Sequence, residues 1–127
     1  MSTGTILIAD DSLVVRAVVR SGLADEGYRV IEAEDGLAAL EQCRQDPPDV
    51  ILLDIVMPEI DGGELATQIE ADRELHNTPI IFLTALVTHT EANSGLQIQG
   101  HPLVAKPISI PELIDAIEKH LPARAEC

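Results

Sequence analysis

The chain alternates short apolar segments with longer helix-like segments. The apolar segments are rich in Val, Ile and Leu and run continuously, which is typical of strands buried on both faces of a sheet. They predict five strands, at residues 5–9, 28–33, 50–53, 80–83 and 103–105. The segments that follow them predict helices at residues 12–26, about 36–45, 64–73, 87–99 and about 109–121.

Residues that commonly begin or end helices support these boundaries. Gly27 stands at the C-cap position of the first helix, and the proline pair beginning at Pro47 blocks continuation of the second. Ser109 and Glu112 have the spacing of a capping box, with a proline near the start of the last helix. Residues 87–99 contain Thr, Asn and Gly, so we expect only a short or mobile helix there.

The alternation of strands and helices indicates a parallel sheet, because parallel neighbours are joined by right-handed helical crossovers. We therefore expect a doubly wound, flavodoxin-like α/β fold, with five parallel strands in the order 2-1-3-4-5 and five helices over both faces. The 127 residues suffice for a single domain. We expect its core at about residues 4–121, with residues 122–127 as a tail or the start of a linker.

Composition limits both the core and the classes of partner. Tyr28 and Phe82 are the two aromatic residues, so the core must consist mainly of aliphatic side chains. A formal net charge of −14 disfavours direct binding to nucleic acid or membrane and suits a divalent cation or a basic protein surface. Cys43 and Cys127 lack metal or redox spacing; we expect Cys43 to pack in a helix or lie partly exposed. No apolar segment approaches the roughly 20 residues of a membrane span, so a cytoplasmic protein is expected.

Polar residues follow four of the predicted strands at the same relative place. Asp10 and Asp11 follow the first strand, while Asp54, Thr84 and Lys106 end the third, fourth and fifth. In a doubly wound sheet, ligands bind outside the carboxyl ends of the strands, where the strand order reverses. The first and third strands are neighbours at that point, so their aspartates should converge in one crevice faced by the threonine and the lysine.

These side chains together suit a phosphoryl group held beside a divalent cation. Three carboxylates in a small crevice repel one another, and Mg²⁺ relieves that repulsion while binding one or two carboxylates and a phosphate oxygen. Lys106 offers a compact positive charge to a second oxygen of a phosphoryl group on Asp54, and the Thr84 hydroxyl is suited to a third. Transfer of such a group needs mainly positioning and charge neutralisation.

Each of these residues also has a simpler structural interpretation. Asp11 and Asp54 could cap a turn or helix, Thr84 could be an ordinary strand residue, and Lys106 could lie on a loop surface. Four such coincidences at four correctly ordered strand ends are much less expected than one site. The histidines share no spacing, and we interpret them as loop or surface residues. They are His76, His89, His101 and His120.

Four motifs containing these residues resemble those of response-regulator receiver domains, and the resemblance covers about the whole chain. They are residues 6–12 (ILIADDS), 49–58 (DVILLDIVMP) followed by 61–62 (DG), 83–85 (LTA) and 106–107 (KP). The resemblance implies a phosphorylation-dependent switch in two-component signalling or a phosphorelay. Asp54 would accept a phosphoryl group from a phosphohistidine, with Mg²⁺ or alternatively Mn²⁺ as the cofactor, and would hydrolyse it slowly.

The resemblance also assigns roles to the surrounding residues. Asp11 would bind the cation directly, together with the phosphoacceptor and the backbone carbonyl of Val56, and Asp10 would act directly or through water. Lys106 would bridge to the phosphoryl group, and Thr84 would move toward it. The peptide bond after the lysine is a candidate for the cis form, because the next residue is proline.

Some positions depart from the family pattern or vary within it. Leu103 stands where the family usually has Tyr or Phe, so we expect the output surface near the fourth helix and fifth strand to work differently. Val56 and Leu86 flank the site, two residues after the aspartate and the threonine, and two aliphatic side chains there predict a fairly long-lived phosphoryl state. Ala85, directly after the threonine, belongs to the same group of switch and tuning positions.

An apolar surface beside the site is expected to bind the phosphoryl donor. Leu13 and Val14 begin a first helix that is apolar all round, and Pro107 and Ile108 lie across the predicted crevice. The resemblance implies a histidine kinase or a histidine phosphotransfer protein as that donor, and an unidentified protein as the downstream target. The alternative is that these side chains are core or ordinary surface residues.

Two other functions remain open at this stage. One is a magnesium-dependent phosphohydrolase with an aspartyl-phosphate intermediate, although such enzymes typically place both acids on one strand and enclose the substrate under a cap domain. The other is a degenerate receiver domain used only for binding, which the presence of all the key residues disfavours. A stand-alone receiver is the simplest interpretation, and a segment of a longer regulator would have the same sequence features.

Overall fold

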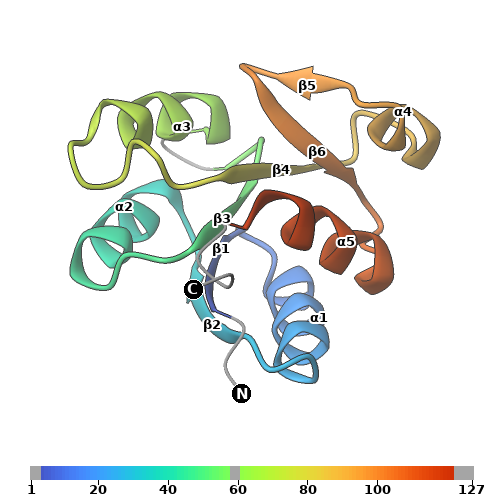
Figure 1. The fold of residues 1–127 in the computed structure, drawn as a ribbon, viewed down its shortest axis with the longest axis horizontal. Coiled ribbons are helices and arrows are strands. Elements are labelled where there is room, and N and C mark those ends of the chain that lie inside the picture. The colour runs from blue at the N-terminus through green and yellow to red at the C-terminus, as the bar shows by residue number, and fades with distance from the viewer. Residues whose placement is uncertain (1–3, 58–60, 122–127) are drawn as a thin grey trace.

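The computed structural model describes residues 4–57 and 61–121, and it confirms the doubly wound α/β fold (Figure 1). The sheet has the strand order β2-β1-β3-β4-β6-β5, in which the first five are parallel neighbours and β5 pairs antiparallel with β6. In chain order the elements are β1 (Thr5–Ala9), α1 (Leu13–Ala24), β2 (Arg29–Ala33), α2 (Gly36–Gln45), β3 (Val50–Asp54), α3 (Gly62–Ala71), β4 (Ile80–Thr84), α4 (His89–Asn93), β5 (Gln97–Ile98), β6 (His101–Ala105) and α5 (Ile110–His120).

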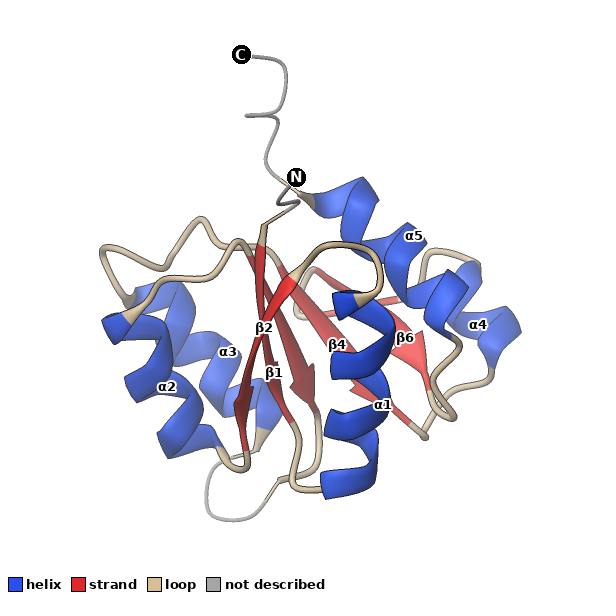
Figure 2. Ribbon diagram, turned by 90° about the horizontal axis from the view of Figure 1, so that it is seen from below, coloured by secondary structure: helices blue, strands red, loops and turns tan. Residues whose placement is uncertain are grey.

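The sheet separates two apolar cores, with α2 and α3 on one face and α1 and α5 on the other (Figure 2). Successive side chains of a strand point to opposite faces. In β1, Leu7 and Ala9 therefore belong to the core under α2 and α3, while Ile6 and Ile8 belong to the core under α1 and α5. A central strand is buried on both faces and is therefore apolar at every position before its carboxyl end, which explains the continuous apolar segments in the sequence.

The strand register brings the carboxyl ends of the central strands to one edge of the sheet. Ala9 of β1 pairs with Leu53 of β3, so the residues that follow them are neighbours. Asp54 pairs with Leu83 of β4, and Thr84 pairs with Ala105 of β6. The predicted order 2-1-3-4-5 is thus confirmed with β6 in the fifth place, and the register alone places the predicted site residues together.

Side-chain caps fix the starts of the helices. In each case a side-chain oxygen accepts a hydrogen bond from the backbone N–H three residues later, which satisfies one of the free donors of the first turn. The caps are Ser12, Asp35, Asp61, Thr88 and Ser109. Because Asp61 caps α3, this helix begins at Gly62, two residues earlier than predicted.

The expected capping box at the last helix is present in part. Ser109 accepts from the N–H of Glu112 at 3.5 Å, while the Glu112 carboxylate lies 2.7 Å from Nδ1 of His89. The reciprocal capping box forms instead at α4, between Thr88 and Glu91.

The segment between β4 and β6 differs most from the prediction. Its helix, α4, is five residues long, which confirms the expected short helix. It is followed by the short strand β5, which the sequence did not indicate. Gln99 and Gly100 join β5 to β6 with positive φ angles of 55° and 80°, as a tight hairpin turn requires. The added strand also extends the start of β6 to His101, two residues before the predicted start.

Several smaller expectations can be compared with this fold. Cys43 is fully buried in the core under α2 and α3, and this burial, assisted by the charge of Asp72, raises the pKa of its thiol to about 12. Cys127 and the predicted tail lie outside the described residues. Within residues 4–57 and 61–121, no helix is long and apolar enough to cross a membrane.

Candidate functional site

Three carboxylates meet at the carboxyl edge of the sheet. One oxygen from each of Asp10, Asp11 and Asp54 lies within 4.8 Å of the others. Asp10 is fully buried and Asp54 nearly so, whereas Asp11 is exposed. Carboxylate oxygens at this spacing repel one another and form the kind of hard-oxygen donor set that Mg²⁺ prefers. The residues present therefore fit the predicted cation.

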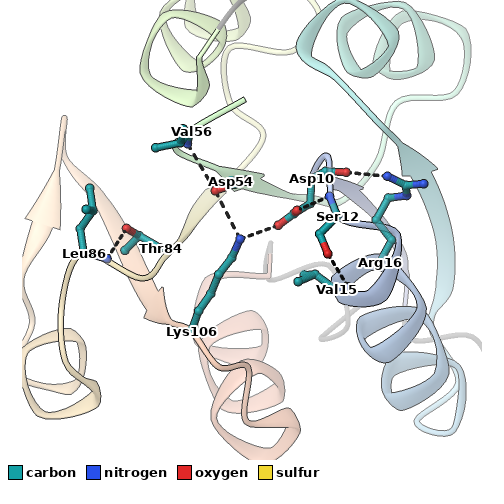
Figure 3. A network of polar contacts seen from close by, with 9 residues as sticks. All are labelled: Asp10, Ser12, Val15, Arg16, Asp54, Val56, Thr84, Leu86 and Lys106. Atoms are coloured by element: carbon teal, nitrogen blue, oxygen red, sulfur yellow. Dashed lines mark hydrogen bonds and ion pairs between the residues drawn. The ribbon is translucent and has the colours of Figure 1, made fainter. Parts of the chain in front are cut away.

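Lys106 bridges the two buried carboxylates from the end of β6 (Figure 3). Its Nζ lies 2.9 Å from Oδ2 of Asp10 and 3.4 Å from Oδ1 of Asp54. Burial disfavours the charged ammonium, but the hydrogen bond and charge of Asp10, with the charge of Asp54, outweigh it and raise the pKa of Lys106. The site thus contains a permanent cation that partly balances its carboxylates. The peptide bond from Lys106 to Pro107 is cis, as predicted.

Asp54 is held in an environment that disfavours its ionised form. Burial and the neighbouring negative charge of Asp10 raise its pKa, and Lys106 together with the N–H of Val56 only partly offsets them. That N–H donates to Oδ1 of Asp54 at 3.3 Å. A bound cation would stabilise the ionised carboxylate of Asp54. A covalent phosphoryl group would replace that carboxylate charge with phosphoryl oxygens that contact partners of their own.

Thr84 is buried beside the site at the end of β4. Its hydroxyl oxygen accepts a hydrogen bond of 2.9 Å from the N–H of Leu86 (Figure 3). A hydroxyl that accepts in this way still has its own proton to donate. The side chain is therefore able to donate to an additional acceptor near Asp54.

Asp10 is contacted at each of its polar atoms. Its N–H donates to the carbonyl of Ala33, and its Oδ1 accepts from the N–H of Ser12 at 2.8 Å. Its Oδ2 accepts from Lys106, and its backbone carbonyl accepts from Nη1 of Arg16 at 2.7 Å. Arg16 was not predicted as a site residue; its available signal was a charged residue in an otherwise apolar segment that follows an acidic pair.

The start of α3 packs directly on the backbone of the phosphoacceptor candidate. The N–H of Gly62 donates to the carbonyl of Ile55 at 2.8 Å. A Cβ atom at Gly62 would lie 2.4 Å from the backbone oxygen of Asp54 and 2.9 Å from Cα of Ile55. Both neighbours are backbone atoms of the site, so only glycine allows this approach.

We expect Gly62→Ala to destabilise the fold by about 2 kcal/mol, because the backbone after β3 must shift to accept the methyl group. Gly63→Ala is the matched control in the same helical turn, where the new Cβ meets only ordinary contacts at 3.5 Å or more. It should stabilise α3 by up to about 1 kcal/mol through helix propensity. Urea unfolding of both variants measures the difference, and equal effects would contradict the close approach.

Most of the remaining predicted residues are exposed beside the site. Leu13 and Val14 are 68% and 70% exposed at the start of α1, and Val56, Ala85, Leu86 and Pro107 are also exposed. Ile108 is half-buried against the core under α1 and α5, so it contributes less surface than predicted.

Leu103 is buried, and its register partner in β4 is Phe82. The ring of Phe82 makes an edge-to-face contact with His101, with ring centroids 5.7 Å apart.

The comparisons with known proteins agree with this geometry. Residues 6–118 match the model of the response regulator receiver domain. The chain is 32% identical over 119 residues to the polar-differentiation response regulator DivK of Brucella suis, covering 94% of this chain and 97% of that protein. The crystallised chemotaxis protein CheY4 of Vibrio cholerae superimposes with a TM-score of 0.81 at 29% identity, covering 95% and 99% of the two chains.

Other relatives are much longer than this chain. A probable cyclic di-GMP phosphodiesterase of Vibrio cholerae is 40% identical over 121 residues, which cover 95% of this chain and 27% of that protein. A probable transcriptional regulator, ycf27 of Guillardia theta, is 39% identical over 108 residues, and these cover 41% of its length. The chain thus spans less than half the length of each of these two relatives.

Proposed function

Because the chain belongs to the response regulator receiver family, we propose that Asp54 is its phosphoacceptor and that Asp10 and Asp11 complete a divalent-cation site. Domains of this family are phosphorylation-dependent signalling switches. The observation that carries the proposal is the set of three carboxylates within 4.8 Å, bridged by the ammonium of Lys106.

The proposed reaction is transfer of a phosphoryl group from a phosphohistidine. An oxygen of Asp54 forms a bond to phosphorus while the phosphorus–nitrogen bond breaks, and the electron pair of that bond returns to the imidazole. When bound, Mg²⁺ (or Mn²⁺) supplies neutralisation of the charge that develops on the phosphoryl oxygens. We assign its binding to Asp11, Asp54 and the backbone carbonyl of Val56. Asp10, whose oxygens already accept from Ser12 and Lys106, would contribute through water.

Lys106 and Thr84 are the proposed ligands of the transferred group. The ammonium of Lys106 is close enough to Asp54 to bind an oxygen of a phosphoryl group there after a small displacement away from Asp10. At the neighbouring strand end, the O–H of Thr84 donates to no acceptor among residues 4–57 and 61–121. These contacts would bias the domain toward its active conformation by stabilising only the phosphorylated form.

A phosphohydrolase is less well supported than a switch. A cavity of about 590 Å³ lies between α4, β6 and α5, and its lining includes Leu103, Glu112 and Lys119 but none of the three site carboxylates. The relative named a phosphodiesterase is mostly composed of sequence that this chain does not match. We propose that the chemistry of this chain is limited to self-catalysed phosphotransfer and slow dephosphorylation.

The phosphoryl donor is proposed to be a histidine kinase or a histidine phosphotransfer protein. Leu13 and Val14 lie exposed at the start of α1 beside the site, and Pro107 and part of Ile108 lie across it. An apolar partner helix would bury these side chains and bring its phosphohistidine to Asp54. The output partner is proposed to be a protein, because the net charge of −14 disfavours nucleic acid and membrane as direct targets.

Incubation with Mg²⁺ and a small acyl phosphate such as acetyl phosphate tests the proposed function. Intact-mass analysis should find one phosphoryl group per chain, and a chelator should prevent its addition. Borohydride reduces an aspartyl phosphate to homoserine, so peptide mass analysis should locate the change at residue 54. Labelling at another residue, or labelling that needs no divalent cation, would contradict the proposal.

The decay of this label measures the predicted long lifetime. Val56 and Leu86 flank the site with aliphatic side chains, which should hinder attack by water on the acyl phosphate. Val56→Ala is therefore expected to shorten the half-life of the label several-fold, while Val18→Ala, on the exposed part of α1, leaves it unchanged. Equal half-lives in all three proteins would remove Val56 from the control of hydrolysis.

A further inference from the structure

Arg16 reaches from α1 to the carboxyl end of β1, where it contacts the backbone of Asp10 (Figure 3). It also contacts Glu32 on the neighbouring strand, β2. Its Nη1 donates to the backbone carbonyl of Asp10 at 2.7 Å, and its Nε donates to Oε1 of Glu32 on β2 at 3.1 Å. The side chain is only 12% exposed. Burying a guanidinium is costly unless its donors are hydrogen-bonded, and these two contacts stabilise Arg16 in this position.

The carbonyl that Arg16 contacts belongs to the peptide unit between Asp10 and Asp11. A peptide unit is planar, so fixing its carbonyl also fixes its N–H and narrows the directions in which both flanking residues project. The N–H of Asp10 is fixed independently by the carbonyl of Ala33. Arg16 therefore acts on the backbone that sets the spacing between two of the three site carboxylates.

We propose that Arg16 is a positioning residue of the divalent-cation site, anchored by Glu32 and acting through the Asp10–Asp11 peptide. This proposal rests on the proposed function, because it assigns a role toward the cation of that site. Arg16 itself does not contact the reacting atoms. Groups that hold metal-binding residues in place commonly change metal affinity about 10- to 100-fold when they are removed.

Arg20 provides a matched comparison on the same helix. Its Nη1 lies 2.9 Å from Oε2 of Glu32, so Arg16 and Arg20 share one carboxylate partner. Arg20 is 64% exposed, and its described contact is with Glu32 rather than with Asp10. Removal of either arginine deletes one positive charge and one ion pair to Glu32, but only removal of Arg16 releases the Asp10 carbonyl.

The sign of the effect separates positioning from simple electrostatics. Deleting a positive charge near three carboxylates should strengthen cation binding if charge alone matters. Releasing the Asp10–Asp11 peptide should weaken it, because the carboxylates then need ordering when the cation binds. The two explanations thus predict changes in opposite directions for Arg16→Gln.

Electron paramagnetic resonance of free Mn²⁺ measures this affinity without depending on phosphorylation. We expect Arg16→Gln to raise the Mn²⁺ dissociation constant at least about 10-fold and Arg20→Gln to change it less than about 2-fold. Unchanged or tighter binding by Arg16→Gln, or equal weakening by both variants, would overturn the proposal. A wild-type chain that binds no Mn²⁺ at millimolar concentration would overturn it as well.

Lysine variants of Arg16 and Arg20 separate the effect of charge from the effect of geometry. They also replace the glutamine variants as the test if Arg16→Gln does not fold. An ammonium keeps the charge but cannot direct two donors at Asp10 and Glu32 as the planar guanidinium does. Arg16→Lys should therefore also weaken Mn²⁺ binding several-fold, whereas Arg20→Lys should match the wild type. If both Arg16 variants fail to fold while both Arg20 variants fold, Arg16 is structural and the proposal is wrong.

Phosphoryl labelling distinguishes failure of this proposal from failure of the proposed function. In Arg16→Gln the Mg²⁺ concentration for half-maximal labelling should rise by the same factor as the Mn²⁺ dissociation constant, while saturating Mg²⁺ restores most of the labelling rate. A lowered rate at saturation with unchanged half-maximal Mg²⁺ would overturn the positioning role. If the wild type is not labelled at Asp54, the proposed function fails, and Mn²⁺ affinity still decides the role of Arg16.

Discussion

Asp54→Asn is expected to abolish phosphoryl labelling and, at the same time, to make the folded chain more stable. The amide has no oxygen nucleophile that can form an acyl phosphate, so the label should disappear under conditions that modify every wild-type chain. Asp115→Asn is the control, because Asp115 is an exposed carboxylate on α5 that pairs only with Lys119 among its described ion pairs. Residual labelling of Asp54→Asn at the wild-type level would show that another residue is modified.

The gain in stability follows from the raised pKa of Asp54, which burial and Asp10 cause. A carboxyl whose pKa is higher in the folded state binds more protons there than in the unfolded state. Its contribution is therefore complete below the ordinary pKa of 3.8 and is lost as pH rises through the raised folded value. At neutral pH the ionised Asp54 disfavours the fold, and Asp54→Asn should raise the free energy of unfolding by about 1 kcal/mol.

Urea unfolding in the presence of a chelator measures this gain. It should be largest near neutral pH and shrink as the wild-type carboxyl becomes protonated in acid. A variant that is less stable than the wild type at neutral pH would show that the Lys106–Asp54 contact at 3.4 Å outweighs burial and repulsion.

Lys106→Ala is expected to have the largest effect on stability. The substitution leaves Asp10, which is fully buried, without its cationic partner at 2.9 Å and beside a second carboxylate. Removing one member of a buried pair typically costs about 3 kcal/mol, since the other charge stays desolvated. The rate of phosphoryl transfer should also fall by about 10²-fold, as one preorganised donor to the developing charge is lost.

Mg²⁺ should restore part of the stability of Lys106→Ala, because a cation bound to the folded state opposes the same repulsion. Unfolding in chelator and in excess Mg²⁺ therefore separates the two effects. Lys119→Ala removes an exposed lysine that pairs with Asp115 and should change stability by less than about 0.5 kcal/mol under both conditions. If Lys106→Ala were as stable as the wild type in chelator, the Lys106–Asp10 pair would make no contribution to the free energy of unfolding.

The sequence predicted the strands and the site because both depend on rules that act along the chain. Strands buried on both faces must be apolar at every position, so their ends are visible where polar residues begin. Asp10 and Lys106 follow such strands, Asp54 and Thr84 are the last residues of theirs, and the parallel topology brings these strand ends to one edge. Their convergence could therefore be inferred from the order of residues along the chain.

Features that depend on contacts between distant side chains were not predictable in this way. Arg16 contacts the Asp10 carbonyl because the helix and the strand end happen to face each other, and its sequence position carries only a weak signal. Glu112 has the spacing of a capping box but contacts His89 of α4, a competing partner 23 residues away. The strand β5 has two residues, too few for any periodicity to be recognised.

The ion pair between Lys106 and Asp10 joins residues 96 positions apart, and this separation matters during synthesis of the chain. A ribosome must translate nearly the whole domain before the lysine becomes available, although the two aspartates that follow the first strand and Asp54 emerge much earlier. Contacts of such long separation close late, since the intervening chain must first be ordered. Until then the acidic residues at the ends of β1 and β3 lack the ammonium that balances their negative charge. A nascent chain in which these strands have already formed would depend on cations from the solvent to balance it.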